Sequence, residues 1–239
     1  MILLVRADRE FLVEPGAELH TDLGVIDVPE DIEPGETIET HLGEPFGVRA
    51  LRGPDLFAHL ERTGAPMMPK DIGLLVGHTG VSAGDRVLDA GTGTGVLAAY
   101  LGRMHAEVTT YERKPEFAEV ARENMELADV ADRVDVRTGD LTVEMDALSG
   151  FDVLTLDTED APEVVAGAPE LLVSGGFVAV YSPFIEAARA VADAAEEAGI
   201  TDVTTRETIQ RRMDFDDRGS RPQTAGVGHT GYLTIGRLP

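Results

Sequence analysis

The sequence predicts an α/β protein, in which a Rossmann-like parallel sheet follows a small β-rich domain. The first observation is a short apolar run that breaks into alternating glycines at Gly91, Gly93 and Gly95. A strand, a glycine turn and a helix in this order are typical of nucleotide-type ligand sites. The second is that apolar runs alternate with helical patterns from about Arg62 onward, which indicates parallel strands joined by crossover helices. The third is a strand-rich pattern confined to residues 1–61.

The N-terminal domain, residues 1–61, is predicted from short alternating runs separated by turn residues. Its strand candidates are Ile2–Val5, Glu10–Val13 and Thr37–His41, and its turn candidates are Pro15-Gly16, Pro34-Gly35 and Pro45-Phe46-Gly47. Residues 62–239 form the second predicted domain. The 239 residues exceed the usual size of a single domain, so one large and one small domain fit the length.

The glycine turn follows Arg86–Ala90, whose aliphatic residues suit a buried parallel strand. We expect a helix from about Gly95 to Met104, with its first amides free to receive ligand oxygens. A dinucleotide fingerprint needs a third glycine where this chain has Val96. The run is Gly-x-Gly-x-Gly instead, which favours S-adenosylmethionine, a methyl donor without a pyrophosphate, over NAD.

Carboxylates follow three later strands of the predicted sheet. Glu112 lies twenty-one residues beyond Gly91, a spacing typical of an acid that accepts hydrogen bonds from ribose hydroxyls. Ligands of open α/β sheets bind at the carboxyl ends of the strands, so these acids and the glycine turn should converge on one crevice. For any single acid, the alternative is a solvated loop carboxylate. The strands and their acids are Glu107–Glu112 with Glu112, Val134–Thr138 with Asp140, and Phe151–Leu156 with Asp157.

The remaining elements complete an alternating series that ends in a hairpin. Alanine and glutamate are frequent in 118–128 and 187–198, as in surface helices, and Gly199 is a plausible stop for the second. Two strands, Thr204–Met213 and Gly231–Gly236, are expected to pair antiparallel at one edge of the sheet. The Asp- and Gly-rich segment 214–228 would join them as a loop.

Composition narrows the class of protein. The chain has 44 acidic residues against 20 basic ones, and Lys70 and Lys114 are its only lysines. This balance is the pattern expected of a protein that works in concentrated salt, where charge repulsion is screened within about 3 Å at 1 M. The chain lacks cysteine, and its six histidines show no zinc-like spacing, so we expect no metal ion. No apolar run reaches membrane-spanning length, so the expected location is the cytoplasm.

From about Pro66 to Leu238 the chain resembles the archaeal and bacterial tRNA (adenine-N1)-methyltransferases. The resemblance implies a class I S-adenosylmethionine-dependent methyltransferase fold, with a Rossmann-like seven-stranded sheet whose last strand is antiparallel. It also implies a small N-terminal β domain, tRNA as substrate and a homotetramer. The motifs that carry it are Pro69-Lys70-Asp71, Asp89–Gly95, Tyr111-Glu112-Arg113, Leu156-Asp157, Tyr181-Ser182-Pro183, Arg221-Pro222 and Gly228–Tyr232.

Position and resemblance together predict the site residues. Asp157 is the catalytic candidate, because a carboxylate that accepts a hydrogen bond from the N6 amine of adenine would raise the nucleophilicity of N1. The expected cofactor-binding residues are Gly91, Gly93, Thr94, Gly95, Val96, Leu97, Glu112, Asp140 and Asp157. The expected substrate-binding residues are Lys70, Tyr181, Pro183, Arg211, Arg221 and His229.

Several alternatives remain open at the level of sequence. The arginines near the C-terminus, Arg206 to Arg221, could pair with neighbouring acids instead of RNA phosphates. His229 could be a structural hydrogen bonder, and Lys70 an exposed ion pair. The whole chain could be a class I methyltransferase for a corrinoid precursor or a protein carboxylate, or a noncatalytic RNA-binding subunit. The intact glycine turn and acids argue against the last possibility.

Overall fold

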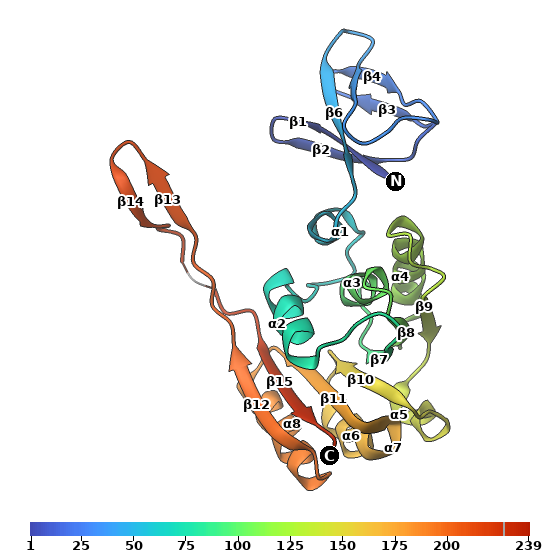
Figure 1. The fold of residues 1–239 in the computed structure, drawn as a ribbon, viewed down its shortest axis with the longest axis vertical. Helices are drawn as coiled ribbons and strands as arrows, with labels where there is room; N and C mark the ends of the chain where they lie inside the picture. Colours follow the sequence, from blue (N-terminus) through green and yellow to red (C-terminus); the bar gives the residue numbers. More distant parts are fainter. Residues whose placement is uncertain (227) are drawn as a thin grey trace. The chain divides into compact units, whose positions relative to one another are not determined.

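The computed structural model describes residues 1–226 and 228–239, which divide into two compact units, Met1–Leu60 and Glu61–Pro239. The ribbon in Figure 1 follows both units along the chain. Within the described residues, no helix combines the length and the apolar character needed to cross a bilayer.

The first unit is built on a four-stranded antiparallel sheet with the order β2-β1-β6-β5. A separate hairpin of β3 and β4 and one short helix, α1, complete the unit. Its core includes Leu4, Ile26 and Phe46, each fully buried. The bounds are β1 Ile2–Arg6, β2 Arg9–Val13, β3 Glu18–Thr21, β4 Gly24–Asp27, β5 Thr37–Glu39, β6 Pro45–Ala50 and α1 Gly53–His59.

One predicted turn of this unit is wrong. Pro45-Phe46-Gly47 is the start of β6, which lies between β1 and β5. Pro45 takes the first position of the strand, where a missing N–H is tolerated. Phe46 is directed into the core. Its ring and the ring of Phe11 form an edge-to-face contact, with the two ring centroids 6.0 Å apart. Burial of an aromatic side chain therefore outweighs the turn preference of proline and glycine here.

The second unit contains the predicted seven-stranded sheet, with the order β12-β15-β11-β10-β7-β8-β9. The five strands from β11 to β9 are parallel to one another, and β15 pairs antiparallel with both β11 and β12. This confirms the predicted fold class, including the antiparallel last strand. The bounds are β7 Arg86–Ala90, β8 Glu107–Glu112, β9 Val134–Thr138, β10 Phe151–Leu156, β11 Leu172–Ser182, β12 Thr201–Glu207 and β15 Tyr232–Arg237.

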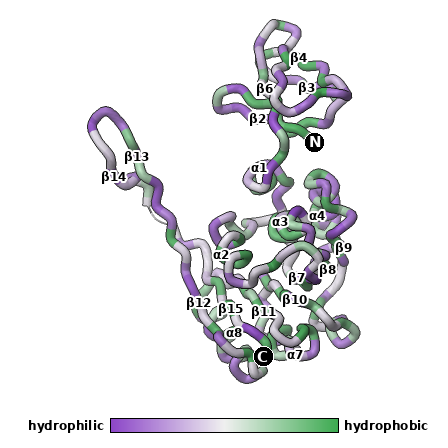
Figure 2. The backbone as a smooth tube through the Cα atoms, viewed as in Figure 1, coloured by the Kyte–Doolittle hydropathy of each residue, from purple (hydrophilic) through white to green (hydrophobic). Residues whose placement is uncertain are grey.

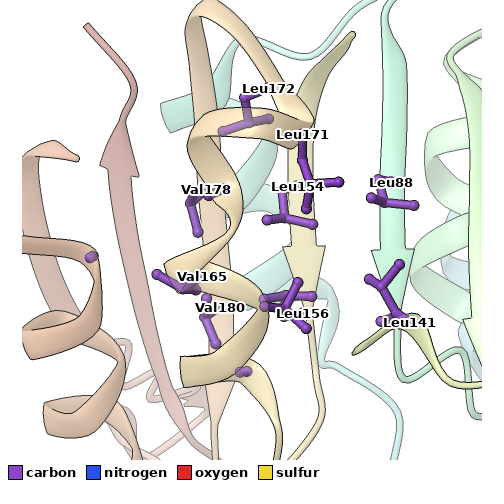
Figure 3. Close-up of a cluster of buried hydrophobic side chains, with 14 of the residues drawn as sticks. Leu88, Leu141, Leu154, Leu156, Val165, Leu171, Leu172, Val178 and Val180 are labelled. Carbon is purple, nitrogen blue, oxygen red and sulfur yellow. The ribbon is translucent and has the colours of Figure 1, made fainter. Parts of the chain in front are cut away.

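Helices connect the parallel strands and bury their apolar faces against the sheet. One buried cluster joins Leu88, Leu154 and Val180 of three neighbouring strands to Val165 and Leu171 of the covering helices (Figure 3). Strands buried on both faces are rich in apolar residues, as are β10 and residues 177–180 of β11. Figure 2 colours the backbone by the hydropathy of each residue. The helices are α2 Pro69–Thr79, α3 Val96–Arg103, α4 Pro115–Leu127, α5 Leu141–Glu144, α6 Ala161–Ala166, α7 Ala168–Leu171 and α8 Ile185–Glu197, with a 3₁₀ turn at Met145–Ala147.

The segment between β12 and β15 differs from the prediction of a plain loop. β12 ends at Glu207, and a second antiparallel pair follows, β13 Met213–Asp216 with β14 Gly219–Pro222. The tip closes because Asp216 Oδ1 accepts the Arg218 N–H at 2.9 Å and Gly219 adopts a φ of +133°. This β13–β14 ribbon forms a sheet of its own beyond the end of β12 (Figure 1).

Candidate active site

The glycine turn after β7 is in direct contact with the end of β10. Gly91, Gly93 and Gly95 all have positive φ, at +89°, +51° and +81°. A Cβ on Gly91 would lie 2.1 Å from the carbonyl oxygen of Asp157. Because that atom belongs to the backbone, it has little freedom to move away. Glycine at position 91 is therefore required both by its φ and by the close approach of the two strand ends.

The residues after the turn hold it against the body of the unit. Gly95 is the N-cap of α3, and the first helical residue, Val96, is buried. The Thr94 hydroxyl accepts the Thr63 N–H at 3.3 Å, and the Thr94 carbonyl accepts a hydrogen bond from Asn124 Nδ2 at 2.8 Å. Asn124 is fully buried on α4 and also bonds the backbone of Glu61. The turn therefore has a fixed shape, with its amides grouped at the edge of the sheet.

Glu112 ends β8 and points back toward the glycine turn. Its Oε2 accepts the Gly93 N–H at 3.0 Å, and its Oε1 accepts the Lys114 N–H at 3.0 Å. Only 8% of the residue is exposed. Each carboxylate oxygen can accept a further hydrogen bond, so the side chain is oriented and can still receive two hydroxyl groups.

Asp140 caps the short helix α5 at the end of β9. Its Oδ1 accepts the Thr142 N–H at 3.0 Å and the Thr142 hydroxyl at 2.8 Å. These hydrogen bonds are the main reason why the pKa of Asp140 lies below its usual value, and the Arg113 guanidinium, 3.8 Å from Oδ2, lowers it further. Asp140 is therefore an ionised acceptor.

Asp157 lies directly after β10 and differs from the other two acids. No described residue donates a hydrogen bond to its carboxylate, although its backbone N–H bonds Ala90 O at 2.9 Å. Burial, with a smaller contribution from the negative charge of Asp89, raises the pKa of Asp157 to about 7. A carboxylate with free lone pairs and a pKa near neutrality is suited to interact with a substrate proton.

A hydrogen-bonded network in the sheet lies beneath these groups, and its residues are not among the predicted site residues. Asp89 of β7 is buried between Thr110 and Thr155, its register partners on β8 and β10, and accepts a hydroxyl from each at 2.5 Å. Thr110 also shares a 2.5 Å hydrogen bond with Thr92 of the turn. Desolvation raises the pKa of Asp89, and the two hydroxyls oppose the rise. The alternation of buried and exposed residues along a single strand does not reveal hydrogen bonds between side chains of neighbouring strands.

The three acids and the glycine turn meet around one cavity of about 370 Å³. Its lining includes Gly91, Gly93, Glu112, Asp140 and Asp157. A smaller cavity of about 110 Å³ adjoins it, sharing Gly91, Gly93, Phe117 and Asp157 and adding Thr94, Val96 and Leu97. Eight of the nine predicted cofactor-binding residues therefore line these two cavities. Gly95, the ninth, is the N-cap of α3 and lines neither.

The cavity fits a ligand such as S-adenosylmethionine in size and chemistry. Small-molecule sites span about 300–1,000 Å³, and a cofactor with two ribose hydroxyls and an amine needs acceptors of the kind that Glu112 and Asp140 supply. Gly93 has no atom within 3.8 Å of where a Cβ would lie, so its backbone is open to a ligand. Among the described residues, no group of three or more His, Asp or Glu side chains could hold a metal ion.

Two lining residues, Arg113 and Phe117, were not singled out as site residues in the sequence. Arg113 bridges strand ends, with Nη1 2.6 Å from Asp160 and Nη2 3.0 Å from Glu159. Phe117 of α4 lines both cavities and packs under the Lys114 ammonium, 4.5 Å from the ring centroid. Both follow Glu112 closely in the chain, a signal that could have found them.

The predicted substrate-binding residues fall into two groups. Lys70, Tyr181, Pro183 and His229 gather where α2, the end of β11 and the start of β15 meet. Lys70 is not an exposed ion pair, because only 8% of its side chain is accessible and its Nζ lies 2.8 Å from Asp71. His229 uses both ring nitrogens, toward Glu207 Oε1 at 2.7 Å and Pro183 O at 2.8 Å.

Arg211 and Arg221 form the second group, away from the cavity and at the β13–β14 ribbon. Both are exposed. Arg221 faces Asp214 across the ribbon, and Arg218 pairs with Asp216 at 2.7 Å. The local acids therefore take up part of this positive charge, whereas Glu207 of β12 binds His229.

Comparison with known proteins decides the family. The family described as "tRNA methyltransferase complex GCD14 subunit" matches residues 54–219. The chain belongs to this family. A curated relative, the tRNA (adenine(57)-N(1)/adenine(58)-N(1))-methyltransferase TrmI of Methanocaldococcus jannaschii, is 31% identical over all of this chain and 94% of its own length. The tRNA (adenine(58)-N(1))-methyltransferase TrmI of Thermus thermophilus is 28% identical over 98% of this chain and 94% of its own.

Solved structures of similar fold extend over the whole chain of this family member. A SAM-dependent O-methyltransferase from Thermotoga maritima matches with a TM-score of 0.85 and 28% identity, covering 99% of this chain and 92% of that one. The tRNA (m1A58) methyltransferase TrmI from Aquifex aeolicus matches with a TM-score of 0.77 and 22% identity, covering 99% and 95%. The fold is that of a class I S-adenosylmethionine-dependent methyltransferase.

Proposed function

We propose that this protein transfers a methyl group from S-adenosylmethionine to N1 of adenine in the T loop of tRNA. The observation that carries the proposal is the single cavity where the glycine turn, Glu112, Asp140 and Asp157 converge. The similarity of the full chain to enzymes named for adenine-N1 methylation supports the choice of substrate.

In this proposal the cofactor is held by the strand ends. The backbone from Gly91 to Leu97 binds the methionine part, the two free lone pairs of Glu112 accept the ribose hydroxyls, and Asp140 accepts from the adenine amine of the cofactor. When bound, the cofactor supplies a methyl group on a sulfonium, ready for in-line displacement. The protein needs no covalent residue for that reaction, because positioning and charge stabilisation are sufficient.

Asp157 acts on the target base. Its partner-free carboxylate accepts a hydrogen bond from the exocyclic N6 amine, which directs electron density toward N1. Methylation at N1 would leave the adenine ring cationic. The negative charge of Asp157 stabilises this cation in a partly buried site, where electrostatic interactions are stronger than in water.

The target base must reach Asp157 from outside. N1 lies on the Watson–Crick edge, which pairing or tertiary folding covers, so we infer that the base is swung out into the site at a cost of a few kcal/mol. Tyr181 and Pro183 would border the inserted base, with Lys70 and His229 supporting that wall. Their grouping at the carboxyl end of β11, beside β10, supports this role.

The β13–β14 ribbon is our candidate for the tRNA-contacting surface. Residues 208–223 contain four arginines and three aspartates, whereas the whole chain has a net charge of −24. Arg211 and Arg221 are the exposed arginines proposed to contact phosphates. Binding that depends on phosphate contacts weakens as salt rises, so substitution of either arginine by glutamine should also reduce the salt dependence of tRNA binding.

The ribbon also supports the proposed homotetramer. Met213 and Phe215 alternate along β13 and share one face, and they are 48% and 77% exposed. An isolated two-stranded ribbon is marginally stable in water, so a second copy of the chain covering this face would stabilise it. Light scattering on the wild type and on Phe215→Ser measures the assembly directly.

We further propose that the protein works in the cytoplasm of an extreme halophile. The net charge of −24 and the presence of only two lysines support a high-salt environment. At low ionic strength the acidic groups repel one another over about 30 Å at 0.01 M. Circular dichroism during dialysis from multimolar potassium chloride into dilute buffer should therefore show unfolding, and an unchanged spectrum would remove the support for this proposal.

Nucleoside mass spectrometry tests the function. The purified protein is incubated at high salt with unmodified tRNA and labelled S-adenosylmethionine, and digested nucleosides are examined for labelled 1-methyladenosine. A second arm offers protein carboxylates and a corrinoid precursor, because the Thermotoga maritima structure is named an O-methyltransferase. Label in 1-methyladenosine is the expected result. Label only in the second arm would overturn the tRNA assignment.

A further inference from the structure

A chain of polar contacts joins the start of α2 to the end of β11. Lys70 Nζ lies 2.8 Å from both carboxylate oxygens of Asp71. The Asp71 side chain is 2% exposed. The Thr230 hydroxyl approaches Asp71 Oδ2 at 3.4 Å and also makes a hydrogen bond with the Tyr181 phenol. The four residues come from α2, β11 and the segment before β15, which pack against one another.

The chemistry of these groups fixes the direction of the chain of hydrogen bonds. An ionised carboxylate is an acceptor only, so Thr230 must donate its one proton to Asp71. The Thr230 oxygen can then only accept from Tyr181. The phenol proton therefore points toward Thr230. The lone pairs of the phenol oxygen remain available to accept a hydrogen bond from another donor.

The ring of Tyr181 is confined on a second side by glycine. A Cβ on Gly231 would lie 2.4 to 2.8 Å from three atoms of the phenol. Any other residue at 231 would displace the ring. Burial raises the pKa of Tyr181, and the negative charges of Asp71 and Asp157 add to the rise, although a hydrogen bond from Thr230 to the phenolate would oppose it. Leu156 and Val180 are register partners on β10 and β11, so Asp157 and Tyr181 follow at adjacent positions of the two strand ends.

We propose that Asp71 and Thr230 are positioning residues that present the Tyr181 oxygen as a hydrogen-bond acceptor beside Asp157. This inference rests on the proposed function, because an adenine N6 amine has two N–H groups and could donate one to Asp157 and the other to Tyr181. In this arrangement the ion pair with Lys70 leaves Asp71 as an acceptor and thereby sets the direction of the whole chain of hydrogen bonds. Two acceptors facing one amine would also select adenine over bases with a carbonyl at that position.

Thr230→Val is the primary test, because it removes the hydroxyl and keeps the shape of the side chain. We expect kcat with tRNA to fall about tenfold or more, with little change in KM or in the affinity for S-adenosylmethionine. Thr230→Ser restores the hydroxyl and should restore kcat. Asp71→Asn is less informative, since it leaves the Lys70 charge buried without a counterion and threatens the fold.

A double-mutant cycle separates positioning from a general structural role. If Thr230 acts through the phenol, Tyr181→Phe combined with Thr230→Val should be no slower than Tyr181→Phe alone. Additive losses in kcat would overturn the proposal. Equal unfolding temperatures of Thr230→Val and Thr230→Ser would show that the kinetic difference does not come from stability.

Nuclear magnetic resonance tests the chain of hydrogen bonds without catalysis. With tyrosine labelled at Cζ, the Tyr181 resonance of the ligand-free protein should shift in Thr230→Val and stay near its wild-type position in Thr230→Ser. An unshifted resonance in Thr230→Val would overturn the inference whatever the kinetics show. If the resonance shifts but the wild type forms no 1-methyladenosine, the proposed function is overturned, and the catalytic role of the chain with it.

Discussion

The two ends of the seven-stranded sheet each carry a cavity, and the larger one is not the candidate active site. The cavity at the amino ends of β7, β8 and β9 measures about 450 Å³, compared with about 370 Å³ at the carboxyl ends. The amino-end cavity is lined by three arginines, Arg86, Arg122 and Arg133, together with four acids. Size and charge alone would therefore point to the wrong end.

The difference lies in what the charged groups already bind. At the amino end, Arg133 pairs with Glu107 at 3.1 Å, Arg86 donates to Gly150 O at 2.7 Å, and Arg122 donates to Val136 O at 3.2 Å. At the carboxyl end, the Asp157 carboxylate has no hydrogen-bond donor among the described residues. Charges that are satisfied within the fold stabilise it, whereas an oriented acid with free lone pairs is available to a ligand.

The largest effect is expected when one carboxylate at each end of the sheet is replaced by the corresponding amide. Asp157→Asn should lower kcat about 100-fold or more, since it removes the charge that activates and stabilises the base. The matched change at the other end, Asp135→Asn, removes an acid that lines the amino-end cavity and pairs with Arg137 at 2.7 Å. We expect its methylation rate to stay within about twofold of wild type. Comparable losses in both variants would remove the distinction between the two ends.

The glycine turn offers a second pair of variants within the carboxyl end. Gly91→Ala meets the backbone of Asp157 and a positive φ, so it should lower the free energy of unfolding by roughly 2–4 kcal/mol. Gly93→Ala has the space for a methyl group and should cost about 1 kcal/mol from its φ of +51° alone. Denaturant titrations give the free energy of unfolding of both variants. Calorimetry with S-adenosylmethionine shows whether Gly91→Ala also weakens cofactor binding more than Gly93→Ala does.

The pH dependence of the rate examines Asp157 itself. With a pKa of about 7 in the ligand-free protein, the carboxylate needed for catalysis forms as pH rises, so kcat/KM should rise about tenfold per unit below pH 6 and level off near pH 8. Stability has the opposite sign, because a carboxyl pKa above its unfolded value makes the folded state lose stability as pH rises from about 4 through 7. Asp157→Asn should accordingly be more stable than wild type at pH 8 by about 1–3 kcal/mol, and no more stable at pH 4.

The smallest expected effect is at the amino end. Arg133→Gln breaks the partly exposed pair with Glu107, and pairs of this kind contribute about 0.2–1 kcal/mol. We expect a small decrease in unfolding free energy, further reduced by salt, and an unchanged methylation rate. A loss of activity in this variant would mean that the larger cavity takes part in function.

Local sequence was informative wherever one segment contains the whole signal. The strand, turn and helix around Gly91, and the acids that end β8 and β10, follow from glycine spacing and from the rule that parallel strands share one carboxyl edge. Prediction was wrong where contacts distant in sequence outweighed local preference. Phe46 makes the proline–glycine segment a strand by filling the core of the first unit. The loop predicted over 214–228 was wrong for another reason, because the local turn closed by Asp216 and Gly219 was not recognised.

The sequence by itself determined the residue types and the order in which they occur: the glycines, the acids at the strand ends and the strongly negative charge. Only the tertiary structure decided how each carboxylate differs from the next. Asp89 is enclosed by two hydroxyls, Glu112 accepts two backbone amides, and Asp157 is partly buried with no donor among the described residues. The physical reason is that the pKa and the free lone pairs of an acid depend on neighbours that the sheet brings together from strands far apart in the chain.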